Sequence, residues 1–230
     1  MQRRILIGTS GFSYPEWKGS FYPEKLPSKK YLSYYAEHFP TTEINNTFYR
    51  IPTSANTAEW YKAVGADFSF TLKLSQRITH QKKLQNCEEE MSRFLDAAKE
   101  LREKMGPILV QLPPFFKQNL QVLQEFLEAH SANSRLAFEF RHDSWFEEST
   151  YQMLQEHGCS LAVVESEERK AEHRVTGNFV YMRLRKEDYS KEELFSWSKW
   201  MGEESVDVYC YLKHDVKAPA FARQLMDLLA

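Results

Sequence analysis

The chain has 230 residues, of which 42% are hydrophobic and 14% aromatic. This length and composition suit a packed globular core and exclude a disordered or low-complexity chain. Lysine and arginine number 30 against 32 aspartate and glutamate residues, so the net charge is -2. This balance predicts no global attraction to nucleic acid or to acidic membranes, and any anion must be bound by a local group of charges.

The cysteines and the apolar runs predict a soluble, cytoplasmic protein. Cys87, Cys159 and Cys210 are far apart and form no CxxC pair, which is typical of buried free thiols in a reducing compartment. The N-terminus has a run of three apolar residues before Gly8, too few for the core of a signal peptide. No stretch approaches the roughly 20 apolar residues that span a bilayer, so we expect no membrane association.

Short apolar runs alternate with segments of helical periodicity, which is the pattern of βα units around a parallel sheet. The predicted strands are residues 5–8, 42–45, 68–73, 108–111, 136–140, 160–164, 179–183 and 206–212. The predicted helices are residues 29–38, 54–64, 88–105, 118–130, 148–157, 191–201 and 219–229. We expect Gly106 and Pro107 to end the third of these helices.

The connection after the sixth strand differs from the others. Residues 165–177 have no apolar stripe and predict a solvated loop or a short helix. Otherwise strand and helix alternate without a linker or a repeat, which favours a closed (β/α)8 TIM-type barrel over an open doubly wound sheet. We expect a single α/β domain over residues 1–230, with one helix short or missing after strand six.

The predicted site is built from the residues at the carboxyl ends of the strands, because active sites of such barrels lie at the face that these ends form. Strand alternation pairs Glu43 with Asn45, Glu139 with Arg141, and Tyr181 with Arg183 on common faces. A charge within an apolar strand avoids the helix-covered face, so these side chains should face the mouth of the barrel. Lys73 ends the third strand, His80 follows it, and Gln111 ends the fourth.

These residue types predict acid/base chemistry on an anionic substrate, either phosphorylated or carrying a carboxylate. Three cations against two carboxylates leave about one positive charge. The two carboxylates should differ in pKa, and Lys73 among cations should have a lowered pKa. The hypothesis makes the protein an enzyme and assigns catalysis to Glu43, Lys73 and Glu139. Substrate binding is assigned to Asn45, His80, Gln111, Arg141 and Arg183, and no cofactor is identified.

A purely structural role for the same charges is the main alternative, since Glu43 with Lys73, or Glu139 with Arg183, could form a buried ion network. Substitution of either glutamate by glutamine should leave stability unchanged or raised at a functional site. It should cost several kcal/mol in a structural network. Two other functions remain open: binding of nucleic acid or a metabolite without turnover, and metal-dependent hydrolysis using His80, His142 and His214.

Five motifs in combination resemble the YecE-like family, domain of unknown function 72, over nearly the whole chain. They are residues 8–14 with Trp17 and residues 21–23; residues 43–50; Lys73 with residues 78–80; residues 111–114; and residues 139–142 with Trp145. The resemblance implies a TIM-type barrel and a set of site positions without a reaction. By architecture alone it also resembles endonuclease IV and xylose isomerase.

The chain departs from the family pattern at three places. Phe12 stands where the family usually has tryptophan, and Arg185-Lys186 follow the seventh strand where the family usually has His-Gly. After strand eight the usual Asn-rich ending is replaced by Lys213, His214 and Asp215. The resemblance therefore predicts a site that carries more positive charge in its second half.

Overall fold

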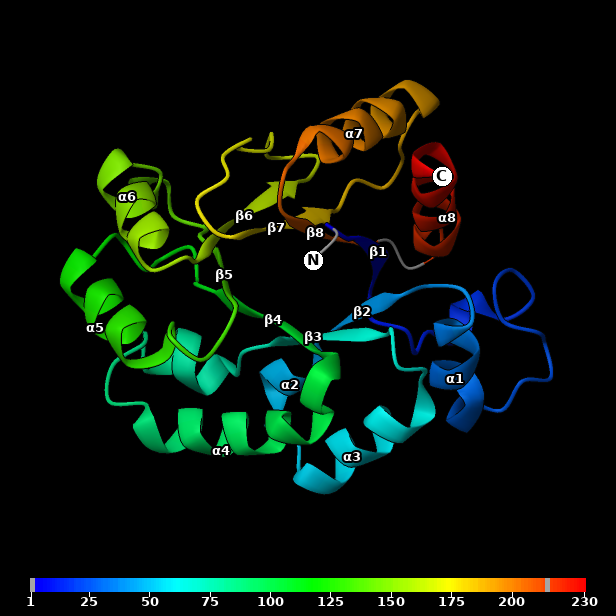
Figure 1. Ribbon diagram of the computed structural model, residues 1–230, viewed down its shortest axis with the longest axis horizontal. Coiled ribbons are helices and arrows are strands. Elements are labelled where there is room, and N and C mark those ends of the chain that lie inside the picture. Colours follow the sequence, from blue (N-terminus) through cyan, green and yellow to red (C-terminus); the bar gives the residue numbers. More distant parts are fainter. Residues whose placement is uncertain (1–2, 214–215) are drawn as a thin grey trace.

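The chain folds into a closed eight-stranded parallel barrel, as the computed structural model of residues 3–213 and 216–230 shows (Figure 1). Each strand pairs with its neighbours in sequence, and β8 closes the ring against β1. The strands are β1 (Ile5–Ser10), β2 (Thr41–Ile44), β3 (Ser69–Lys73), β4 (Met105–Gln111), β5 (Leu136–Glu139), β6 (Ser160–Glu165), β7 (Phe179–Leu184) and β8 (Asp207–Leu212).

Helices surround this ring, with apolar faces against the strands (Figure 1). The α-helices are α1 (Tyr31–Ala36), α2 (Asn46–Tyr49), α3 (Ser54–Ala63), α4 (Glu88–Ala98), α5 (Leu120–His130), α6 (Glu148–Glu156), α7 (Lys191–Glu203) and α8 (Ala218–Leu229). Residues 166–178, all described, contain no helix, which confirms the expectation for the connection after strand six. The predicted TIM-type barrel is therefore confirmed.

The predicted helix 88–105 is wrong at its C-terminal end. The α-helix ends at Ala98 and continues as the tighter η4 (Lys99–Lys104), interrupted at Arg102 with φ 50°. Met105, Gly106 and Pro107 belong to β4 instead of closing the helix. A side chain at position 106 would lie 2.5 Å from the Ser69 hydroxyl oxygen, so glycine is required there by the close approach of β3.

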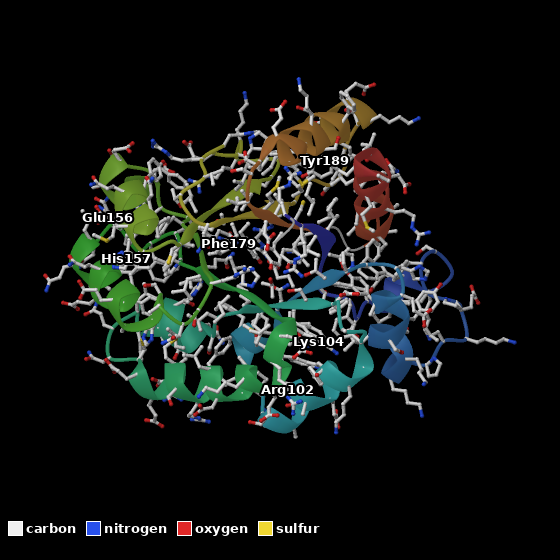
Figure 2. The ribbon with its side chains drawn as sticks, in the orientation of Figure 1. Arg102, Lys104, Glu156, His157, Phe179 and Tyr189 are labelled. Carbon is white, nitrogen blue, oxygen red and sulfur yellow. The ribbon has the colours of Figure 1, made fainter. Side chains whose placement is uncertain are left out.

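Lys104, at the end of η4, connects this segment with α3 at the base of the barrel (Figure 2). Its ammonium group is buried and donates to the carbonyl oxygens of Tyr61 at 2.7 Å and Val64 at 2.8 Å. These carbonyls belong to the end of α3, where the helix leaves its last acceptors without internal partners. The ammonium also lies 4.0 Å from the centre of the Tyr61 ring, so Lys104 caps α3.

Aromatic side chains fill the barrel below its mouth. Phe179, Tyr181, Tyr209 and Tyr211 form an inner cluster separate from the larger core under the helices, and Phe179 lies inside the ring of strands (Figure 2). The Tyr211 hydroxyl shares hydrogen bonds with Thr41 at 2.8 Å and Thr71 at 2.7 Å. Phe179 and the three tyrosines thus form an aromatic plug, in which Tyr181 donates to Glu43 and Tyr209 accepts from Arg135.

The glycines of the first connection have different roles. Gly11 has φ 98°, the left-handed conformation that a tight turn after β1 requires. Gly8 lies within β1, as the predicted strand 5–8 requires, and a Cβ there would come 2.0 Å from the Thr41 carbonyl oxygen. It permits close pairing of β1 with β2.

The remaining expectations from composition concern thiols and membranes. Cys87, Cys159 and Cys210 are free and buried, as expected. Within the part of the chain that the structure describes, no helix is both long and apolar enough to cross a membrane.

Candidate functional site

The charged side chains at the carboxyl ends of β2, β5 and β7 meet at one guanidinium group. Arg183 on β7 is 3% exposed, and it binds Glu43 of β2 through Nη2 at 2.8 Å and Glu139 of β5 through Nη1 at 2.5 Å. Both glutamates are equally inaccessible. One buried cation therefore bridges two buried carboxylates from opposite sides of the strand order, which is a geometry that only a planar, forked group provides.

Glu43 is held by hydrogen-bond donors from β1, from β7 and from Asn45, which follows β2. It accepts from the Ser10 hydroxyl through Oε1 and from the Tyr181 hydroxyl through Oε2, both at 2.5 Å. The Asn45 amide donates to Oε1 at 3.0 Å. Register explains the first contact, because Ser10 and Glu43 are aligned across β1 and β2. The predicted pairing of Glu43 with Asn45 on one face is confirmed.

Glu139 lies at the centre of the positive side of the mouth. Gln111, its register partner on β4, donates to Oε1 at 2.7 Å. Arg141 approaches the same oxygen at 3.2 Å and Arg185 at 3.7 Å. The predicted pair of Glu139 and Arg141 is thus confirmed, and Arg185, noted in the sequence as a departure but not assigned to the site, joins it.

Both carboxylates are held as anions, which corrects the expected division into an acid and a base. Burial by itself would raise the pKa of Glu139, but Arg183, Arg141 and Arg185 outweigh it and bring the pKa to about 2. Burial would also raise the pKa of Glu43. Arg183 and the Ser10 and Tyr181 hydroxyls outweigh this effect and lower the pKa of Glu43 below its ordinary value. Neither glutamate has the raised pKa of a general acid.

Lys73, the last residue of β3, is the titrating group of this cluster. Burial lowers its pKa to about 8, and the neighbouring Arg183 acts in the same direction against the smaller opposite effects of Glu43 and Glu139. Its Nζ lies 4.1 Å from the centre of the Phe48 ring and forms no hydrogen bond or ion pair with the described residues. The expected depressed pKa agrees with this environment, whereas the expected ion pair with Glu43 is not formed.

His80 and Phe48 complete the wall beside Lys73. Phe48 belongs to the short α2 and His80 to the π-helix η3 (Arg77–Gln81), neither of which the sequence pattern predicted. Their rings pack edge to face with centres 4.9 Å apart. Burial, together with Lys73 and Arg141, lowers the pKa of His80 and favours a neutral imidazole. A π-helix is rare and is often found at functional sites.

The segment after the π-helix is also unusual. Lys83, Leu84 and Asn86 have positive φ of 51°, 69° and 48°, a conformation that costs energy for residues other than glycine. The strained stretch connects the wall of the site to α4. Such strain clusters near ligand sites, and here it follows directly on the π-helix that carries His80.

Two histidines proposed as metal ligands can be placed, and one cannot. His142 caps the short η5 (Asp143–Trp145) by accepting from the Ser144 backbone at 3.1 Å, so it has a structural role. His80 faces Phe48, and His214 and Asp215 lie outside the described residues. Among residues 3–213 and 216–230, no three His, Cys, Asp or Glu side chains form a metal-binding group.

The aromatic side chains of the loops around the mouth are largely packed in the core. Trp17 and Trp145 are fully buried, and the Trp145 indole donates to the Phe116 carbonyl oxygen at 2.7 Å. Tyr49, at the end of α2, is the exception because its side chain is 73% exposed. Aromatic residues therefore hold the loops around the mouth, while Tyr49 faces solvent.

The fold and this ring of charges define the class of protein, an α/β barrel with a buried Glu-Arg-Glu network and a lysine at its mouth. A family model, "Protein of unknown function DUF72", matches residues 6–230. The chain belongs to this family, which confirms the resemblance found in its motifs.

Solved structures and curated relatives agree with this assignment. A DUF72 family protein from Thermotoga maritima is 28% identical and superposes with a TM-score of 0.85 over 99% of each chain. One from Enterococcus faecalis has a TM-score of 0.79 at 23% identity, covering 98% of this chain and 95% of that one, a likeness of fold.

Curated sequences extend the match to two model bacteria. UPF0759 protein YunF of Bacillus subtilis is 30% identical over 157 residues, which are 64% of this chain and 54% of the relative. UPF0759 protein YecE of Escherichia coli is 28% identical over 168 residues, or 70% of this chain and 59% of the relative. The matched region therefore spans little more than half the length of these relatives.

Proposed function

We propose that this protein is an enzyme that binds a small anionic substrate at the mouth of the barrel and exchanges a proton between that substrate and Lys73. The observation that carries the proposal is the division of charge around Arg183. This arginine takes up both carboxylates, while the Lys73 ammonium has no polar partner among the described residues. A half-buried amine left free beside partly exposed arginines is suited to a ligand.

The anion would be held by the partly exposed arginines. The Arg141 side chain is 37% exposed and that of Arg185 is 23% exposed, so both keep donors for an incoming group while contacting Glu139. Counting Lys73 and Arg183, four cationic side chains surround two carboxylates. This excess of positive charge favours binding of a phosphate or carboxylate. It is larger by one charge than the sequence predicted, because Arg185 joins the site.

Lys73 has the properties of a proton-transfer group near neutral pH. General acid/base catalysis is most effective when the pKa of the group lies near the working pH, and that of Lys73 is about 8. Glu43 and Glu139 would act as fixed anions that orient Arg183, while Asn45 and Gln111 hold the carboxylates. The neutral His80 beside Phe48 would accept or donate a hydrogen bond to the substrate.

Two measurements test the proposal. Thermal shift and calorimetric titration with inorganic phosphate, small carboxylates and sugar phosphates should detect binding, and Arg141→Gln and Arg185→Gln should weaken it. Arg223→Gln, on the far outer helix α8, serves as a matched control. Deuterium uptake from D2O into the bound compounds, followed by NMR, should then be lost in Lys73→Met with binding retained.

The same experiments separate turnover from binding alone. Binding that is accompanied by no exchange and is unaffected by Lys73→Met would make the barrel a binding module. Binding of oligonucleotides with steep salt dependence would point to nucleic acid instead. No anion binding by the unmodified protein would overturn the proposal.

The three buried free thiols support placing this activity in the cytoplasm.

A further inference from the structure

The Lys73 amine combines three features that proton transfer does not require together. It ends a strand at the mouth, so its backbone is held by the barrel and not by a loop. One side of the amine is covered by the Phe48 ring, at 4.1 Å from the ring centre. Its remaining hydrogen-bonding capacity is unused by the described residues, even though two carboxylates belong to the same cluster.

The charged groups around this amine favour its neutral, nucleophilic form. Arg183 from β7 and Arg141 after β5 oppose its protonation, Glu43 and Glu139 favour it less strongly than burial and Arg183 disfavour it, and His80 on η3 is neutral. With a pKa of about 8, about a tenth of Lys73 is neutral at pH 7, against fewer than roughly one in a thousand for an ordinary lysine. Desolvated lysines of this kind are the nucleophiles that form imines with carbonyl compounds.

We propose that Lys73 captures its substrate covalently as an imine, and that the substrate class is a small aldehyde or ketone bearing a carboxylate or phosphate. This inference rests on the proposed function, whose anion-binding arginines it uses. Arg141 and Arg185 would hold the anionic group, and the carbonyl carbon would lie against Lys73 Nζ over the Phe48 ring. The arginines thereby select an anionic carbonyl compound over a neutral one.

The step balances without any further reactant. The neutral amine forms a C–N bond to the carbonyl carbon, and the carbonyl π electrons move to oxygen, which takes up a proton. That first proton comes from the nitrogen and leaves a neutral carbinolamine. The proton that the lysine ammonium released on becoming neutral then protonates the hydroxyl group, which departs as water while the nitrogen lone pair forms the C=N bond of the protonated imine. The carbonyl compound and the lysine ammonium are thus converted into an iminium ion and one water molecule, with no change of net charge or oxidation state.

Borohydride trapping tests this proposal directly, because hydride reduction converts an imine into a stable secondary amine. The full chain is incubated separately with pyruvate, with dihydroxyacetone phosphate and with neutral acetone, each followed by sodium borohydride. Intact mass and peptide mapping should show a gain equal to the anionic probe less one oxygen atom, located on Lys73. Acetone should give about tenfold less product, the factor expected for loss of one charge-assisted contact.

Matched variants separate Lys73 from other lysines. Lys73→Arg keeps the positive charge but cannot form the reducible adduct, so labelling should be lost while the unfolding midpoint is kept. Lys99→Arg, on the exposed surface where Lys99 pairs with Asp96, should label like the unmodified protein. Arg141→Gln should reduce labelling by the anionic probes and leave the weak labelling by acetone unchanged.

The outcomes distinguish this inference from the proposed function beneath it. Phosphate or carboxylate binding without an adduct at Lys73 would overturn imine formation and leave the anion-binding enzyme standing. Labelling spread evenly over surface lysines, or retained in Lys73→Arg, would also overturn the imine. Loss of both binding and trapping would remove the proposed function as well.

Discussion

Two lysines at opposite ends of the barrel, Lys104 buried and Lys73 half-buried, show how the same group can be used for stability or left available for chemistry. Lys104 lies at the base, before β4, and donates to two carbonyl oxygens at the end of α3. Lys73 lies at the mouth, at the end of β3, with no hydrogen bond or ion pair to the described residues. Both ammonium groups lie about 4 Å from the centre of an aromatic ring.

The difference between them is the availability of acceptors. A helix end offers Lys104 carbonyls that would otherwise be unpaired, whereas Glu43 and Glu139, the carboxylates that attract the Lys73 amine, are already paired with Arg183. In (β/α)8 barrels the base serves stability and the mouth serves catalysis. The cap formed by Lys104 and the role proposed for Lys73 match this division, and each of the following substitutions tests it.

The largest expected effect is that of Arg183→Met, which removes the group that keeps Glu43 and Glu139 from Lys73. Two buried carboxylates would lose their shared cation, and we expect a loss of about 3–5 kcal/mol in the free energy of unfolding, measured by urea denaturation. In the variant that still folds, Lys73 would lose the neighbouring positive charge that opposes its protonation and keep the attraction of Glu43 and Glu139, so the pKa of its amine should rise.

Arg183→Lys is the matched control for this change. It keeps one charge but cannot reach two carboxylates in the forked geometry, so an intermediate loss is expected. Equal stability of Arg183→Met and the unmodified protein would contradict the view that this network is a structural unit.

Glu139→Gln should remove part of the acid sensitivity of the fold. The pKa of Glu139 is lowered to about 2 in the folded state, so its contribution is present above the ordinary carboxyl pKa of 4.5 and is lost as pH falls towards 2. The displacement corresponds to about 3 kcal/mol, and the variant should be less stable at pH 7 by about this amount. Urea denaturation between pH 2 and 7 should show a flatter pH dependence for the variant, with exposed Glu148→Gln as control.

Lys104→Met should cost about 2–3 kcal/mol, because it leaves the carbonyls of Tyr61 and Val64 buried without a donor. Neither anion binding nor borohydride labelling at the mouth should change. Denaturation and calorimetric titration of the same preparation measure both. Impaired anion binding in a folded Lys104→Met protein would argue against the separation of base and mouth.

Lys73→Met should have the smallest and opposite effect on stability. The folded state lowers the pKa of Lys73 to about 8, so the protonated form is penalised and its cost is present below pH 8. Replacing it by an apolar side chain should leave stability at pH 7 unchanged or raised by up to about 1 kcal/mol. A loss comparable to that of Lys104→Met would mean that Lys73 is a structural group.

The sequence predicted the barrel well because strand alternation and helical stripes are local patterns. The short α2 and the π-helix escaped detection since a single turn carries no apolar periodicity, and both carry residues that line Lys73. Met105 was placed in a helix because the amphipathic stripe of α4 continues to Leu101, while the strand that follows begins with glycine and proline.

The composition of the site was predictable from side-chain parity, but its partners were not. Parity placed Glu43, Glu139 and Arg183 at one mouth, yet it did not show that Arg183 would take both carboxylates. That outcome depends on contacts between residues more than 40 positions apart and on the reach of a single side chain. Because Arg183 pairs with both glutamates, substitution of a glutamate should lower the stability of the fold. Unchanged stability is expected instead for substitution of Lys73.

The aromatic plug has a kinetic consequence for any ligand of the mouth. Phe179, Tyr181, Tyr209 and Tyr211 occupy the barrel beneath the charged ring and are essentially inaccessible to solvent. An anion held by Arg141 and Arg185 therefore enters and departs on the same side. A reaction product that keeps the anionic group would compete with fresh substrate for this passage, so product inhibition should be competitive.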